Sequence, residues 1–204
     1  MIKDSPTCTK ESLRLVFIVA ATQGWAVQSI DISSAFLQGN AIAREAYIMP
    51  PCEVRREGVV WKLRRCIYGL NDAPRAWYNR VKEEFSKLGA VMSKYDNSLF
   101  MWHLGKKLVG ILVSHVDDFT FAGTRDWDKK VIGGIRRKFK ISTSHVSTFK
   151  YIELMVEQSD DEVKISQDNY ISEIKRIAIT VDRKKELHQP LSKEERLSAD
   201  KCFG

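Results

Sequence analysis

Two adjacent aspartates lie inside one of the most apolar stretches of this 204-residue chain. Asp117 and Asp118 occur in the sequence VSHVDDFTFAG, where the valines and phenylalanines on both sides favour burial. Neighbouring carboxylates that are half buried repel each other and lose hydration unless a cation or a proton neutralises them. Hard divalent cations such as Mg²⁺ take oxygen ligands of this kind. The pattern alone leaves two interpretations open, a metal site and an ordinary hairpin with partly exposed acids.

A third carboxylate from another strand would complete a metal site. Asp31 is the best candidate, because it ends the sequence VQSID and has Ile30 and Ile32 on either side. Two Mg²⁺ ions held by acidic residues of adjoining strands catalyse displacement at phosphorus: one ion activates the attacking oxygen and both stabilise the developing charge. The other Asp-Asp pair of the chain, in the polar sequence QSDDEV, is typical of a solvated turn.

Composition narrows the classes of site and partner. Lysine and arginine total 33 against 26 acidic residues, and the net charge of +7 suits a polyanionic partner without proving one. The four cysteines and four histidines are scattered, with no C-x-x-C or H-E-x-x-H pattern, which argues against a metal site of nitrogen and sulfur ligands. The most apolar stretch, LRLVFIVAA, contains an arginine and is half as long as a bilayer span. We therefore expect a soluble chain with reduced thiols and no membrane partner.

Periodicity and turn residues predict the elements that position these aspartates. Thr9 and Gly24 are the expected cap and stop of a first helix, and Asp72 is the expected N-cap of a second. Helices are predicted at about 9–23, 72–88, 126–139 and 168–179, and strands at 25–32, 47–51, 59–65, 98–102, 108–116, 119–123, 149–158 and 162–166. This order predicts an α+β fold, an antiparallel sheet with helices packed on one face.

Five sequence segments resemble, in order and spacing, the reverse transcriptase domain of copia-type LTR retrotransposons. They are DISSAFLQGN, YIMPP, VWKLRRCIYGLNDAPRAWY, KYDNSLFMW and VSHVDDFTFAGT. The resemblance implies an RNA-directed DNA polymerase, with the palm and part of the fingers of a right-hand polymerase. It assigns residues 1–180 to this palm and partial fingers domain and residues 181–204 to a truncated tail leading toward a missing thumb or connection.

The resemblance also implies residue roles. Asp31, Asp117 and Asp118 correspond to the catalytic aspartates that hold two Mg²⁺ ions, which Mn²⁺ can replace, and Ile32 corresponds to a residue whose backbone carbonyl contacts metal. Phe36 corresponds to the aromatic that excludes a ribose 2′-hydroxyl, although its pattern alone favours a core aromatic. The segment that packs beneath the incoming nucleotide and the template corresponds to Gly69, Asn71, Asp72, Pro74 and Arg75. These five residues are equally consistent with a turn, a cap and a helix start.

Two residues depart from the family pattern at positions expected to contact primer and template. His115 stands where the family most often has Tyr, and Glu153 stands where it generally has Gly in a hairpin that supports the primer terminus. Glu153 indicates either a decayed copy of the element or a side chain that points outward. The expected partners are an RNA or DNA template-primer and dNTPs, with fingers, thumb and ribonuclease H segments supplied by a parent polyprotein in an intracellular, cytoplasmic particle.

Two alternatives remain at this point. The chain is an inactive transposon remnant that still binds nucleic acid, or it is a ferredoxin-like module for RNA binding or protein interaction with the same layer order. The second alternative requires exposed aromatic side chains on the sheet in place of convergent aspartates.

Overall fold

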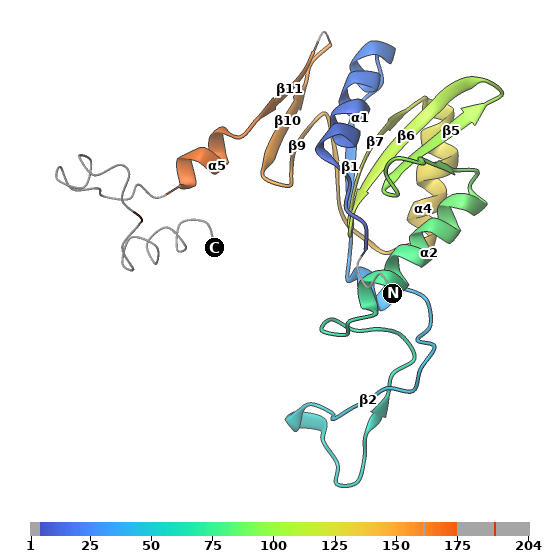
Figure 1. The fold of residues 1–204 in the computed structure, drawn as a ribbon, viewed down its shortest axis with the longest axis vertical. Coiled ribbons are helices and arrows are strands. Elements are labelled where there is room, and N and C mark those ends of the chain that lie inside the picture. The colour runs from blue at the N-terminus through green and yellow to red at the C-terminus, as the bar shows by residue number, and fades with distance from the viewer. Residues whose placement is uncertain (1–4, 161, 175–189, 191–204) are drawn as a thin grey trace.

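A six-stranded antiparallel sheet forms the centre of the fold, in the order β4-β5-β6-β7-β1-β8 (Figure 1). The computed structural model describes residues 5–160, 162–174 and 190. The six strands are β4 (Val91–Met92), β5 (Leu99–Leu104), β6 (Lys107–His115), β7 (Asp118–Gly123), β1 (Gln28–Ile32) and β8 (Ile141–Val146). Every strand pairing in this sheet is antiparallel, and helices alternate with the strands along the chain, so the predicted antiparallel α+β architecture is confirmed.

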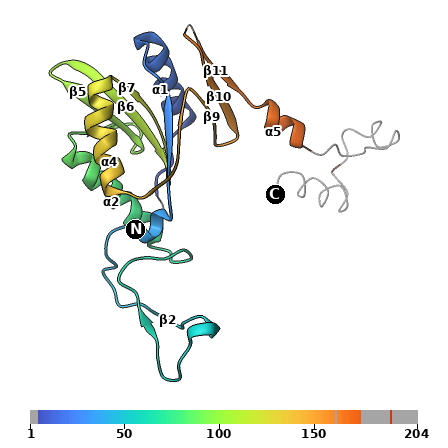
Figure 2. The same ribbon diagram turned by 180° about the vertical axis from the view of Figure 1, so that it is seen from behind.

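Helices cover both faces of this sheet (Figures 1 and 2). On one face lie α2 (Ala73–Lys87) and a helical stretch made of α3 (Arg125–Trp127), a π-helical turn (Asp128–Ile132) and α4 (Gly133–Lys138). Leu112 of β6 and Phe121 of β7 lie on that face and pack with residues of these helices in one apolar cluster. The opposite face carries α1 (Lys10–Gln23), which packs with Val113 and Ala122 in a second cluster.

The prediction that the helices pack on one face is therefore wrong. Successive residues of a strand point to opposite faces, and β6 is buried without interruption from Gly110 to Ser114. A strand that is apolar on both faces needs cover on both sides, and α1 provides the second cover.

Two smaller sheets lie beside the central one. Strands β9 (Thr148–Tyr151), β10 (Leu154–Gln158) and β11 (Val163–Ser166) form an antiparallel sheet in the order β11-β10-β9, followed by α5 (Asp168–Glu173). Strands β2 (Tyr47–Ile48) and β3 (Trp61–Lys62) form a two-stranded arm that extends away from the sheet, with a short helical turn at Cys52–Val54 (Figure 1). Among the described residues, no helix is long and apolar enough to cross a membrane.

The helix boundaries largely follow the sequence signals. The Thr9 hydroxyl accepts a hydrogen bond from the Ser12 N–H at 3.1 Å, and Gly24 ends α1 in the left-handed conformation, as predicted. Asp72 does precede α2, but its side chain does not cap the helix. Its carboxylate instead accepts hydrogen bonds from Arg44 Nε at 3.0 Å and Nη2 at 3.1 Å, so the ion pair replaces the cap.

Three features were not predicted. The helix expected at 126–139 contains the π-helical turn, and its Gly134 lies so close to Leu88 that a Cβ there would be 2.8 Å from a leucine methyl. The strand expected at 149–158 is a hairpin, because the backbone turns with positive φ at Ile152 and Glu153. Strand β8 is almost wholly exposed and polar, and it has little of the apolar alternation that marks a strand in a sequence. The predicted tail at 181–204, and the predicted helix beyond residue 174, lie outside the described residues apart from Pro190.

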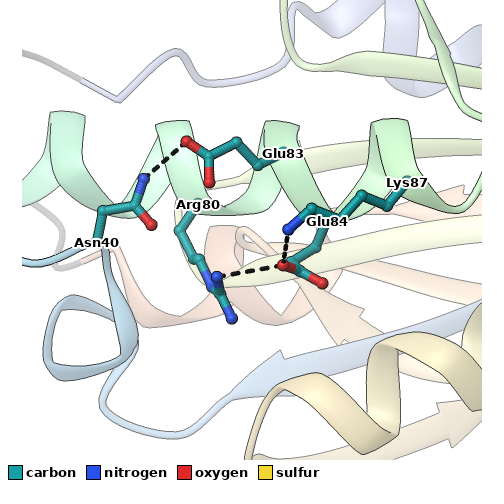
Figure 3. A network of polar contacts seen from close by, with 5 residues as sticks. All are labelled: Asn40, Arg80, Glu83, Glu84 and Lys87. Carbon is teal, nitrogen blue, oxygen red and sulfur yellow. Dashed lines mark hydrogen bonds and ion pairs between the residues drawn. The ribbon is translucent and has the colours of Figure 1, made fainter.

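Polar contacts along α2 include one that joins the segment after β1 to this helix (Figure 3). The Asn40 amide donates to Glu83 at 2.9 Å, and Glu84 pairs with Arg80 at 3.2 Å and Lys87 at 2.8 Å. Next to Asn40, a Cβ on Gly39 would lie 3.1 Å from the backbone nitrogen of Trp77. Glycine therefore lets this segment approach α2 closely.

Asp96, from the segment KYDNSLFMW, lies in the loop between β4 and β5 and connects this loop to the start of α1. Its carboxylate accepts hydrogen bonds from the Thr9 N–H at 2.9 Å and the Ser98 N–H at 2.8 Å. Burial opposes ionisation of Asp96, but hydrogen bonds from Ser12, Thr9 and Ser98 outweigh it and lower its pKa below the usual value.

We expect Asp96→Ala to reduce the free energy of unfolding at pH 7 by about 2–3 kcal/mol, because it leaves backbone donors without partners. Urea denaturation measures this change. The difference from the wild type should shrink as the pH falls below about 4, because a carboxyl with a lowered folded-state pKa loses its stabilising effect when it is protonated. Glu57→Ala, at an exposed position, is the control and should change stability by less than about 0.5 kcal/mol. An equal loss in both variants would contradict the assigned role of Asp96.

Candidate metal centre

Three carboxylates converge at one end of the central sheet. Asp31 and Asp118 face each other as direct partners in the antiparallel pairing of β1 with β7. Asp117 lies in the turn between β6 and β7, next to Asp118. One oxygen from each of the three side chains lies within 4.8 Å of the others, and all three residues are half buried. Strand pairing therefore brings together residues that are far apart in the sequence.

The turn that carries Asp117 is short and held from two sides. Only Val116 and Asp117 separate the paired residues His115 and Asp118, and Val116 has a positive φ of 58°. The Ile32 N–H donates to the Asp117 carbonyl at 3.0 Å. The indole N–H of Trp77, on α2, donates to the Val116 carbonyl at 2.7 Å. Both bonds fix the turn relative to β1 and α2.

Charge repulsion is present among the three acids. Burial, with further contributions from Asp117 and Asp31, raises the pKa of Asp118 to about 6. Burial and then Asp117 raise the pKa of Asp31 as well. The Ser142 hydroxyl donates to the Asp31 carboxylate from strand β8. A cluster of hard oxygen donors that repel one another fits a divalent cation, which would neutralise them.

Most of the other predicted site residues fall into two groups, one directly after β1 and one around the start of α2. Ile32 is buried directly after Asp31, and Phe36 lies in the 3₁₀-helical turn Ala35–Gln38 that follows β1. The Phe36 ring packs against Tyr68, with ring centroids 4.8 Å apart, and against the apolar cluster under the sheet. Phe36 is thus a partly buried aromatic residue that lies close to Asp31 in the sequence.

The second group surrounds the start of α2. Gly69 is exposed with a φ of 89°, Asn71 is exposed, and Pro74 lies in the first turn of the helix. The Arg75 guanidinium lies over the Tyr78 ring at 5.6 Å, and Asp72 pairs with Arg44 as described above. Within the described part of the chain, no hydrogen bond or ion pair joins this group to the three carboxylates. Trp77, about one turn further along the same helix, donates a hydrogen bond to the carbonyl of Val116, the residue before Asp117.

The two residues predicted to contact primer and template, His115 and Glu153, have different surroundings. His115 is half buried, its Nδ1 has no hydrogen-bond partner among the described residues, and burial lowers its pKa while Asp117 opposes this change. His115 and Ile152 line a cavity of about 640 Å³ beside α1. Glu153 has a φ of 60°, and its exposed side chain pairs with Lys150 at 3.0 Å. The Glu153 side chain therefore points to solvent.

Sequence reasoning missed two residues that contact the site. Trp77 lies within the helix predicted at 72–88, but hydrophobic periodicity does not show that its indole N–H is a hydrogen-bond donor to the site. Ser142 lies on β8, a strand that was not predicted. Neither residue has a sequence signal that reveals its contact with the aspartate cluster.

Comparison with known proteins shows the family to which this chain belongs. The profile described as reverse transcriptase (RNA-dependent DNA polymerase) matches residues 3–189. The chain belongs to the reverse transcriptase family. This reverse transcriptase chain is 38% identical over 122 residues to the retrovirus-related Pol polyprotein from transposon RE1 of Arabidopsis thaliana, a match covering 58% of the chain and 8% of that relative.

Two further relatives agree with this result. The Pol polyprotein from transposon RE2 of Arabidopsis thaliana is 37% identical over 122 residues, or 58% of the chain and 8% of that protein. The Pol polyprotein from transposon TNT 1-94 of Nicotiana tabacum is 26% identical over 204 residues, or 97% of the chain and 15% of that protein. The reverse transcriptase chain thus spans a small part of the length of these polyproteins. The predicted copia-type reverse transcriptase family is confirmed, and the ferredoxin-like module is set aside.

Proposed function

We propose that this chain is the palm, with part of the fingers, of an RNA-directed DNA polymerase of a copia-type retrotransposon. The observation that carries the proposal is the convergence of Asp31, Asp117 and Asp118 from β1, β7 and the turn before β7. In a chain of this family, three carboxylates at the end of an antiparallel sheet fit the site of nucleotidyl transfer. The β2–β3 arm is proposed as the partial fingers, and residues up to about 180 as one domain.

The proposed cofactor is a pair of Mg²⁺ ions, with Mn²⁺ as a substitute. Bound at the three aspartates, such a pair supplies activation of the primer 3′-hydroxyl and stabilisation of charge at the phosphate. The residues of the chain hold and orient this centre. Ser142 fixes the rotamer of Asp31, the Ile32 N–H fixes the turn at Asp117, and the Ile32 carbonyl is proposed as a further ligand.

Substrate contacts are proposed for the residues around this centre. Phe36 lies directly after β1 and is proposed to exclude the 2′-hydroxyl of a ribonucleotide. The segment from Gly69 to Arg75 is proposed to lie beneath the incoming dNTP and the template. His115 and the hairpin containing Glu153 are proposed to contact the primer. The net charge of +7 favours binding of an RNA or DNA template-primer through its phosphates.

The test is single-nucleotide primer extension by this chain, with Mg²⁺ and with EDTA in its place. We expect slow extension that requires Mg²⁺ or Mn²⁺ and is lost in Asp117→Asn. If the chain binds template-primer but extends it under neither metal, it is a remnant that retains binding without catalysis. If Asp117→Asn extends at the wild-type rate, the catalytic assignment is wrong.

A further inference from the structure

The turn before the two aspartates has a backbone conformation that its sequence does not favour. Val116 is β-branched and has a φ of 58°, in the left-handed region. Two-residue hairpin loops with positive φ at the first loop residue normally have glycine there, because a side chain branched at Cβ is strained at positive φ. Such a residue keeps this conformation only when its surroundings hold it.

Trp77 is the side chain that holds Val116. Its indole N–H donates to the Val116 carbonyl at 2.7 Å, and the ring is fully buried. The ring lies parallel to Phe119, with centroids 6.5 Å apart, and edge-on to Phe139 at 5.1 Å. Because the ring is fixed by packing, the position of its N–H is fixed as well. That donor points at the peptide directly before Asp117.

We propose that Trp77 is a positioning residue for the metal centre. By holding the Val116 carbonyl, its indole N–H keeps the turn in the conformation that places Asp117 and Asp118 beside Asp31. Without this bond the Val116 peptide relaxes away from positive φ, and the carboxylates separate and reduce their mutual repulsion. This inference rests on the proposed function, since it assumes that the three carboxylates bind divalent metal.

The chain contains a matched control in Trp102. Its indole N–H also donates to a backbone carbonyl, that of Leu88, at 3.1 Å, and its side chain is almost as buried, at 3% exposed. It belongs to the same apolar cluster and packs against Trp127 at 5.2 Å. Its acceptor, however, lies at the far end of α2 from the aspartates. Trp77→Phe and Trp102→Phe each remove one buried indole donor and keep an aromatic ring.

The experiment is titration of the full chain with Mn²⁺, followed by electron paramagnetic resonance of the free ion, with melting temperature measured in parallel. We expect Trp77→Phe to weaken Mn²⁺ binding at least tenfold and Trp102→Phe to change it less than twofold, although both variants melt at lower temperatures. In a Val116→Gly background, Trp77→Phe should weaken Mn²⁺ binding less than threefold, because glycine adopts positive φ without strain.

A second measurement uses the unmodified chain, in case a variant fails to fold. On addition of Mg²⁺, the ¹⁵N–¹H signal of the Trp77 indole should shift and that of Trp102 should not. If the wild type and Asp118→Asn bind Mn²⁺ equally weakly, the proposed function fails. If the wild type binds Mn²⁺ tightly but Trp77→Phe binds it equally well, or if the Trp77 signal does not move on binding, the positioning role is refuted and the proposed function stands.

Discussion

Asp118→Asn should lower Mg²⁺-dependent primer extension at least about 10³-fold, a loss of roughly 4 kcal/mol in transition-state stabilisation. The variant keeps the shape of the side chain but removes one of the three carboxylate charges of the cluster. Asp118 is the partner of Asp31 across the sheet, so its loss leaves the remaining carboxylates with weaker attraction for cations. Single-turnover extension with saturating template-primer measures the effect on the chemical step.

The same substitution should stabilise the chain when metal is absent. Burial and the neighbouring carboxylates raise the pKa of Asp118 to about 6 in the folded chain. A carboxyl with a raised folded-state pKa reduces stability as the pH rises from about 4 to about 6, because the unfolded chain ionises first. Asp118 is only half buried, so after allowance for solvent screening we expect a gain of about 1 kcal/mol at pH 7 and none below pH ~4.

Chemical denaturation with EDTA and with Mg²⁺ separates the two effects. Magnesium should stabilise the wild type and should have little effect on Asp118→Asn. Asp126→Asn, at an exposed position on α3, is the control and should keep both the extension rate and the response to Mg²⁺. Normal extension by Asp118→Asn, or destabilisation of its metal-free form, would contradict the proposed metal centre.

Phe36→Val should raise the ratio of ribonucleotide to deoxyribonucleotide incorporation about tenfold or more. Phe36 lies in the 3₁₀-helical turn that follows β1, and this turn is anchored on α2 through Gly39 and Asn40. In the proposed role, the ring lies beneath the sugar and excludes a 2′-hydroxyl by steric contact. Relief of a clash of ~1.4 kcal/mol already changes the ratio tenfold.

Leu37→Val provides the comparison for Phe36→Val. Leu37 lies in the same 3₁₀-helical turn and is 46% exposed, so its substitution perturbs the turn without altering the proposed sugar contact. Kinetics with matched rNTP and dNTP pairs in a chain that extends primers give the ratio for each variant. If Phe36→Val loses stability while its ratio stays the same, Phe36 is a core aromatic and the proposed steric role is wrong.

The sequence pattern indicated which aspartates could meet, but it left a metal site and an ordinary hairpin open, and the family resemblance favoured the metal site. Asp31 lies near the end of β1 and Asp118 at the start of β7, and antiparallel pairing of those strands places the two residues opposite each other. The helix N-terminus at Thr9 and the stop at Gly24 were equally clear, because each depends on local backbone chemistry. Most features that depend on a single strand, cap or turn were therefore predicted correctly.

Features that depend on tertiary contacts were not predictable in this way. The sequence does not specify that α1 covers the second face of the sheet, since either face of a fully apolar strand accepts a helix. Strand β8 is held by pairing with β1 and by few apolar side chains of its own. Asp72 has the composition of an N-cap, but Arg44, distant in the sequence, binds its carboxylate. The left-handed Val116 likewise lies in a turn that Trp77 and Ile32, both distant in the sequence, hold by hydrogen bonds.

The most direct measurement is an anomalous difference map from crystals of the chain soaked in Mn²⁺. The proposal of a metal-dependent polymerase centre predicts peaks between the side chains of Asp31, Asp117 and Asp118, with metal–oxygen distances of about 2.0–2.3 Å. The same map from Asp118→Asn crystals should lack these peaks or show them much weakened. Saturated Mn²⁺ sites elsewhere on the chain, with none at the three aspartates, would contradict the account.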